Sequence, residues 1–337
     1  KALSVLAVYL PIPIVFYLFY SSKENSKLVY FYAKVYLLYN GFFSVLQLMG
    51  IHITAGELLA NIPIIEVDQG FWGNIGTQGL RISGASFSTI GFACNLGVLF
   101  CYFYFNETKL YSKKMRQVYL IALVVFMIFS QTRSVLLSII PVIFITHNII
   151  NANKLKVFAL SLLGLLTVLV VVVLFLPILQ EQFPRLFLGI EEDGSVVHRI
   201  QANVYGIVGT FYLSPIIGIP FENGLEAMSL GYKKIGLFIG YYFIDEVTQH
   251  NQPAYFFRYY GFIGFSFFVL IYRKFFTIAL LNYNTNNIKK VVVSIVVFHL
   301  FYTFFHNNKF TMDFYLWFFI ALNSLNSYTN YIYEQEA

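Results

Sequence analysis

Long apolar runs alternate with short polar breaks along most of the chain. A membrane-spanning helix needs about 20 mainly apolar residues, and on that criterion the pattern predicts nine spans. They lie at about residues 2–20, 28–50, 84–105, 117–132, 134–150, 157–178, 254–273, 291–306 and 311–330. The run from 117 to 150 is broken only at Gln131-Thr132-Arg133, which predicts a sharp hairpin with its turn at these residues. The fold class that follows is an all-α, polytopic membrane protein.

Composition supports the same class. Of 337 residues, 58% are hydrophobic, 20% aromatic and only 11% charged, and the mean hydropathy is +0.69. Soluble domains carry roughly a quarter charged residues. An ordinary soluble enzyme, a disordered chain and a nucleic-acid binder are therefore excluded, and membrane lipids are an expected partner.

The spans divide the chain into three regions of one integrated membrane domain. Residues 1–178 hold the first spans with an outer loop at 51–83, residues 179–253 form a long extracytoplasmic region, and residues 254–337 hold the last spans. The long region carries the pattern of an amphipathic helix at about 196–212, with Ile200 and Phe211 on its apolar side. This helix is expected to lie along the outer membrane face.

Basic residues concentrate in short loops, which sets the orientation. These loops lie near 21–27, 106–116, 151–156 and 273–290. By the positive-inside rule they face the cytoplasm. Strict alternation then places four other segments outside: 51–83, 132–133, 179–253 and 307–310. The positive-inside rule and the strict alternation of spans agree for every loop of the chain.

The outer side carries arginine where the cytoplasmic loops mostly carry lysine. Arg81, Arg133, Arg185 and Arg199 lie in outer segments, with Arg258 just inside the following span. The planar guanidinium group binds phosphate or carboxylate through paired hydrogen bonds. The pattern predicts an anionic ligand on that side; the alternative is ordinary snorkelling and pairing with local acidic residues.

Two further patterns point to chemistry at the outer face. Arg199, Asn203 and Gly206 align on the polar side of the predicted helix at 196–212, a strip suited to a phosphate, although a solvated helix face has the same pattern. His250 and Asn251 stand directly before the span at 254–273, where an imidazole is placed for acid–base work.

Motifs of cytoplasmic nucleotide or metal chemistry are absent from the sequence. There is no Gly-x-x-x-x-Gly-Lys loop, no Cys-x-x-Cys and no His-Glu-x-x-His. No inner loop is long enough for a nucleotide site. We therefore expect no metal and no cofactor, and a donor that is already activated and membrane-borne.

Several short stretches, taken in order, resemble the O-antigen polymerase and ligase superfamily. They are Arg81-Ile82-Ser83-Gly84, Ser130-Gln131-Thr132-Arg133-Ser134, His198-Arg199-Ile200, Ser214-Pro215-Ile216-Ile217-Gly218, Thr248-Gln249-His250-Asn251 and Tyr260-Gly261-Phe262-Ile263-Gly264. Thr132 stands where the family usually has Ser. Together they span roughly residues 80–265, and their order and spacing are more specific than any one of them.

The resemblance implies a bundle similar to GT-C glycosyltransferases in the bacterial inner membrane, with its active site facing the periplasm. It implies an inverting glycosyltransferase that acts on undecaprenyl-pyrophosphate-linked oligosaccharides as donor and acceptor, without metal. Arg133, Arg199 and Arg81 would bind the donor pyrophosphate and His250 would activate the acceptor. Candidate supporting residues are Asn251, Asn203, Glu222 and His198.

Alternative functions remain open at this level. Within the family, a polymerase adds the glycan to another lipid-linked repeat unit, whereas a ligase moves it to lipid A core. The mixed acidic and basic outer loops favour a polymerase, for which a chain-length regulator is a candidate partner. A transporter of lipid-linked oligosaccharide is the rival from another class, but it usually carries charges near mid-membrane and internal repeats. A structural scaffold would leave the arginine pattern unexplained.

Overall fold

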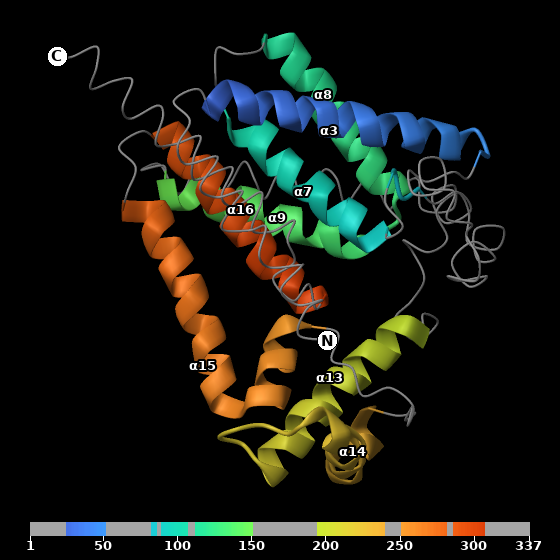
Figure 1. The fold of residues 1–337 in the computed structure, drawn as a ribbon, viewed down its shortest axis with the longest axis vertical. Coiled ribbons are helices and arrows are strands. Elements are labelled where there is room, and N and C mark those ends of the chain that lie inside the picture. The colour runs from blue at the N-terminus through green and yellow to red at the C-terminus, as the bar shows by residue number, and fades with distance from the viewer. Residues whose placement is uncertain are drawn as a thin grey trace, which may run out of the picture. The chain divides into compact units, whose positions relative to one another are not determined.

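Every regular element in the part of the chain that the structure describes is a helix (Figure 1). The structure is a computed structural model, and it describes residues 25–51, 82–85, 89–106, 112–150, 194–239, 251–281 and 286–306. The helices are α3 (Asn25–Leu48), α7 (Thr89–Phe105), α8 (Lys113–Phe129), α9 (Arg133–Ile150), α13 (Gly194–Leu213), η1 (Phe221–Asn223), α14 (Gly224–Ile239), α15 (Gln252–Leu281) and α16 (Asn286–Phe305). The prediction of an all-α chain is confirmed for these residues.

The helices α3, α7, α8, α9, α15 and α16 cover six of the predicted spans. The predicted spans 2–20, 157–178 and 311–330 lie outside the described residues. By length and composition, one described helix could cross a membrane, over Gln252–Thr277 of α15. Shorter apolar helices run over Ile90–Phe105, Arg133–His147 and Lys290–Phe305. The full set of nine spans stays a prediction.

The chain divides into two compact units. The first comprises residues 1–187, 279–299 and 311–337, and the second comprises residues 188–278 and 300–310. The first unit therefore contains α3, α7, α8 and α9, and the second contains α13 and α14 with most of α15.

In the first unit, α7 and α16 are the most completely buried helices. Leu96, Leu99 and Phe103 of α7 have no exposed surface, and Phe298 of α16 is equally buried. A Cβ atom at Gly97 would lie 2.1 Å from the Phe298 ring, so the missing side chain makes room for that ring. The absence of a side chain at Gly97 thus allows the close packing of α7 against α16.

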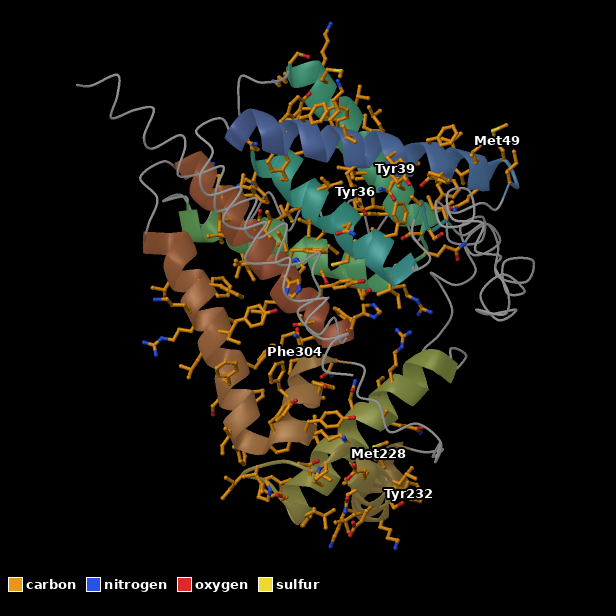
Figure 2. All side chains as sticks on the ribbon, in the orientation of Figure 1. Tyr36, Tyr39, Met49, Met228, Tyr232 and Phe304 are labelled. Carbon is orange, nitrogen blue, oxygen red and sulfur yellow. The ribbon has the colours of Figure 1, made fainter. Side chains whose placement is uncertain are left out.

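Helix α3 buries both polar and apolar side chains and exposes an apolar face. Asn40, Ser44 and Gln47 are buried beside Ala33, Leu37 and Phe43. The exposed side chains include Phe31, Val35, Leu38, Phe42, Val45 and, as Figure 2 marks, Tyr39 and Met49. A helix on the surface of a soluble domain exposes polar side chains instead. In lipid, by contrast, an apolar outer face costs nothing and polar groups join helices inside the bundle.

The second unit is built on the close packing of α13 against α14. A Cβ atom at Gly209 would lie 1.8 Å from the carbonyl oxygen of Ala227, so the two backbones are nearly in contact. Ala202, Tyr205 and Met228 form the buried cluster between these helices, and Figure 2 marks Met228 on α14. Small residues at this crossing bring the helix backbones together.

The predicted helix at 196–212 is confirmed as α13, but its buried face differs from the apolar side read from the sequence. The exposed fractions of Ile200 and Phe211 are 41% and 54%, whereas Ala202 and Tyr205 are buried. Glycine and alanine contribute little to hydrophobic periodicity, so the contact with α14 was not visible in that pattern. The described residues cover the apolar side of α13 only in part, since Val204, Ile207 and Val208 are half-buried.

Candidate functional site

The first group of predicted site segments lies in the first unit, where the backbone that follows Arg81 is held by α3. The side-chain oxygen Oε1 of Gln47 accepts hydrogen bonds from the backbone N–H groups of Ser83 and Gly84, at 2.9 and 3.1 Å. Its Nε2 atom donates to the carbonyl oxygen of Gly84 at 2.8 Å. Asn40, two turns earlier in α3, accepts from the N–H of Ala85 at 3.1 Å. Two buried amide side chains thus fix this loop.

The same loop is bonded to the turn that leads to Arg133. The backbone N–H of Ile82 donates to the carbonyl oxygen of Phe129, the last residue of α8, at 3.1 Å. The segments that follow Arg81 and precede Arg133 are therefore neighbours, although about 50 residues separate them. Arg81 itself lies outside the described residues.

The predicted turn at Gln131-Thr132-Arg133 is confirmed. Gln131 has a positive φ of 50°, a conformation that few non-glycine residues adopt. The Ser130 hydroxyl donates to the carbonyl oxygen of Met127 at 2.7 Å, and the Thr132 hydroxyl donates to the carbonyl oxygen of Ser130 at 3.3 Å. The half-buried Arg133 begins α9 directly after this turn, where the helix dipole also favours an anion.

The second group lies in the second unit, around Asn203 and Asn251. The side-chain oxygen of Asn203 accepts a hydrogen bond from the backbone N–H of Asn251 at 3.3 Å. The side-chain oxygen of Asn251 in turn accepts from the N–H of Ala254 at 2.7 Å, which caps the N-terminus of α15. Both asparagines were predicted as supporting residues, and the structure brings them together.

Arg199 belongs to the same face of α13 as Asn203, one turn earlier, and it is half-buried. Glu222 lies in η1 with an exposed side chain, and no described contact joins it to these residues. His250 and the side chain of His198 fall outside the described residues. The predicted role of His250 as a base therefore stays a prediction, although its neighbour Asn251 is placed.

The Pro-x-x-Gly loop after α13 is docked onto a break in α15. Gly261 has φ 59° and ψ −152°, so the helix is interrupted there. The break leaves backbone N–H groups without partners inside the helix, and they donate to the loop instead. The N–H of Phe262 donates to the carbonyl oxygen of Pro215 at 2.7 Å, and the N–H of Ile263 donates to that of Ile216 at 3.2 Å. In the opposite direction, the N–H of Ile219 in the loop donates to the carbonyl oxygen of Arg258 at 2.8 Å. Two of the stretches that carry the family resemblance thus bond to each other.

Glycine is required on both sides of this contact. Gly218 in the loop has φ 78°, and a Cβ atom there would lie 2.3 Å from the backbone nitrogen of Tyr260. A Cβ atom at Gly261 would lie 2.4 Å from the carbonyl carbon of Ile216. Any other residue would meet both a backbone clash and an unfavourable φ.

The side chains of Arg258, Gln252 and Gln201 in the second unit are fully buried or nearly so, and none of their polar atoms has a hydrogen-bond partner. Buried polar groups in folded proteins are almost always hydrogen-bonded. In the described part of this unit, these side chains therefore offer donors and acceptors to which a ligand or water could bind.

Sequence reasoning missed the two amide side chains of α3 and underrated Arg258. A signal for Asn40 and Gln47 does exist, because polar residues recur on one face of an otherwise apolar helix. Arg258 was noted only as lying inside a span. In the described parts of the chain, no three His, Cys, Asp or Glu residues gather as metal ligands would.

Comparison with known proteins adds no assignment: no protein-family model and no curated protein sequence matches the chain.

Proposed function

We propose that this protein is a polytopic inner-membrane glycosyltransferase that polymerises a surface polysaccharide such as O-antigen. It would transfer the growing glycan from undecaprenyl pyrophosphate to a lipid-linked repeat unit at the periplasmic face. The proposal rests on the ordered set of short motifs that resemble the O-antigen polymerase and ligase superfamily. The observation that carries it furthest is that the stretches at Pro215 and Gly261, distant in sequence, are hydrogen-bonded to each other, and that other stretches bond to residues adjoining a further stretch.

The pairing occurs in both units. The backbone after Arg81 bonds to the turn before Arg133, and the loop at Pro215 bonds to the break at Gly261. Asn203 bonds to Asn251. Phe129 directly precedes the stretch at 130–134, and Asn203 follows the stretch at 198–200 by one turn of α13.

A membrane location has support of its own. α15 is long and apolar enough to span the bilayer, and its exposed side chains include Ile263, Phe267 and Leu270. Helix α3 likewise exposes apolar residues while it buries Asn40 and Gln47. Large exposed apolar surfaces mark contact with lipid or with another protein.

The chemistry follows from the residues assigned. His250 would take the proton from an acceptor hydroxyl, whose oxygen attacks the anomeric carbon of the donor sugar with inversion. The bond from that carbon to the pyrophosphate oxygen breaks, and Arg133, Arg199 and Arg81 would stabilise the departing pyrophosphate. Each such donor is typically worth about 10²–10³ in kcat, and a general base contributes roughly 10²–10⁴.

Reconstitution tests the proposal directly. The purified chain in liposomes, given a lipid-linked repeat unit, should produce a ladder of glycans that differ by one repeat. Lipid A core supplied as acceptor distinguishes a ligase, which would attach the glycan to the core. Failure to form any new glycosidic bond with either acceptor would refute a glycosyltransferase.

A transporter of lipid-linked oligosaccharide is the second candidate, because α15 is interrupted at Gly261. Broken helices in transporters expose backbone groups that bind substrate at mid-membrane. In this chain, however, the groups released at the break by Phe262 and Ile263 are already bonded to the loop at Pro215. Movement of a fluorescent lipid-linked oligosaccharide across the same liposomes, without a ladder, would favour the transporter.

A further inference from the structure

Among the residues that the structure describes, the buried guanidinium group of Arg258 has no hydrogen-bonding partner. The exposed fraction of the residue is 0%, and Nε and both Nη atoms lack an acceptor. The guanidinium lies against the neighbouring ring of Tyr259, whose centroid is 4.2 Å from Cζ. A stacked ring attracts the charge but accepts none of the five N–H groups in the plane of the guanidinium. A buried charge in this state is strongly unfavourable, because nothing replaces its lost hydration.

Arg258 lies near the N-terminal end of α15, two turns after the residue that caps this helix. Arg258 follows Asn251 by seven residues, which places both on one face of α15 about two turns apart. It lies about 9 Å along the candidate span from Gln252. The residue is therefore closer to one end of this span than to its middle.

The backbone around Arg258 is fixed independently of its side chain. Its carbonyl oxygen accepts from the N–H of Ile219, and the helix break at Gly261 follows three residues later. The docked loop therefore holds this part of α15 in place without any contribution from the guanidinium. A purely structural role would require side-chain bonds, and the described residues provide none.

We propose that Arg258 binds a phosphoryl group of a lipid, and that its unmet donors are satisfied only when this ligand is present. If the proposed function holds, the ligand is the pyrophosphate of the lipid-linked donor, and Arg258 joins the arginines assigned from the sequence. A phosphodiester headgroup of the surrounding bilayer has the same chemistry and is the other source. The inference concerns which residue binds the phosphate, and its test is separate from glycan synthesis.

The test measures ligand binding by the full chain in dodecyl maltoside micelles, because this detergent carries no phosphate group. Undecaprenyl pyrophosphate is titrated in one arm and phosphatidylglycerol in the other, and the thermal midpoint Tm is followed at each concentration. The variants are Arg258→Met, which removes the charge, and Arg258→Lys, which keeps the charge but loses the planar fork. Arg273→Met is the matched control, because Arg273 is an exposed arginine of the same helix.

We expect Arg258→Met to leave the Tm of the ligand-free protein unchanged or higher, since it removes an unpaired buried charge. The same variant should weaken binding of undecaprenyl pyrophosphate by about 10- to 100-fold, the loss typical of a hydrogen bond to a charged group. Arg258→Lys should bind with intermediate affinity, and Arg273→Met should bind as the unmodified chain does. A loss confined to the phosphatidylglycerol arm would support the site and identify a membrane phospholipid as its ligand.

Two results would overturn the inference. One is binding of both lipids that is the same in Arg258→Met as in the unmodified chain. The other is a large fall in the Tm of the ligand-free variant, with Arg258→Lys binding normally, because that combination assigns the residue a structural role. If lipid binding depends on Arg258 but no glycan ladder forms, the proposed function is refuted and this inference stands. If Arg258→Met binds lipid and forms the ladder as the unmodified chain does, this inference is refuted and the proposed function stands.

Discussion

The side-chain oxygen of Asn203 accepts a hydrogen bond from the backbone N–H of Asn251, 48 positions later in the chain. This bond ties the polar face of α13, which also carries Arg199, to the residue that caps α15. His250 directly precedes that cap in the sequence. The bond therefore sets where the chain enters α15 relative to the predicted phosphate-binding strip of α13, and a small change at Asn203 should have a larger effect on catalysis than on stability.

Replacement of Asn203 by Ala tests that relationship. We expect the free energy of unfolding to fall by about 1 kcal/mol, the usual contribution of one such hydrogen bond. Polymer yield in the liposome assay should fall by at least tenfold, since a misplaced catalytic group is costly even at small displacements. Asn223→Ala is the control, because Asn223 is exposed in η1. Equal activity of the two variants would show that the bond has no catalytic role.

Replacement of Gly261 by Ala tests the docking of the loop onto the helix break. The new Cβ atom would lie 2.4 Å from the backbone of Ile216 at a φ of 59°. We expect a loss of about 2–4 kcal/mol in the free energy of unfolding, measured by chemical denaturation in detergent. Gly41→Ala is the matched control, because its Cβ would lie at ordinary contact distances, 3.4 and 3.5 Å, from two ring atoms of Phe126. A loss of similar size at Gly41 would mean that the measurement does not report on the loop.

The sequence predicted the helices well because its signal is strong where the apolar runs are long. The turn at Gln131 was also predictable, since three polar residues interrupt a run of more than 30 positions. The buried face of α13 was not, because close packing through Gly209 and Ala227 leaves no hydrophobic stripe to detect. Periodicity reports apolar surface and is insensitive to backbone contact.

The sequence likewise predicted some residues of the candidate site and missed others. Charge and motif order were enough to single out Arg133, Arg199, Asn203 and Asn251. They could not show that Gln47 holds the loop after Arg81, because a polar residue inside an apolar run has many structural explanations. Nor could they show that Arg258 is buried without a partner, since burial depends on packing between segments distant in sequence.

Replacement of Gln47 by Leu tests the support of the loop after Arg81. Two backbone N–H groups, those of Ser83 and Gly84, lose their acceptor, and Ser83 is buried. We expect the free energy of unfolding to fall by about 2–4 kcal/mol, because buried donors without partners are expensive. The exposed Gln117 of α8 provides the control variant Gln117→Leu. If both variants unfold at the same denaturant concentration, the hydrogen bonds of Gln47 to Ser83 and Gly84 contribute nothing to stability.

Replacement of Arg133 by Lys and by Ala tests the assignment of pyrophosphate binding. Lysine keeps the positive charge but cannot form the paired hydrogen bonds of a guanidinium group. We therefore expect kcat to fall by about tenfold in Arg133→Lys and by about 10²–10³ in Arg133→Ala, the range for loss of one transition-state donor. The measurement is the initial rate of glycan extension in liposomes, with kcat and KM determined separately.

The distribution of the loss between kcat and KM identifies the role of Arg133. A group that stabilises the departing pyrophosphate lowers kcat, whereas a group that only binds the lipid raises KM with kcat unchanged. Arg273→Ala serves as the control for loss of an exposed cation, and His250→Ala should abolish extension if the imidazole is the base. If Arg133→Ala extends the glycan at the rate of the unmodified chain, the turn after α8 is structural and the assignment of this arginine to the donor is wrong.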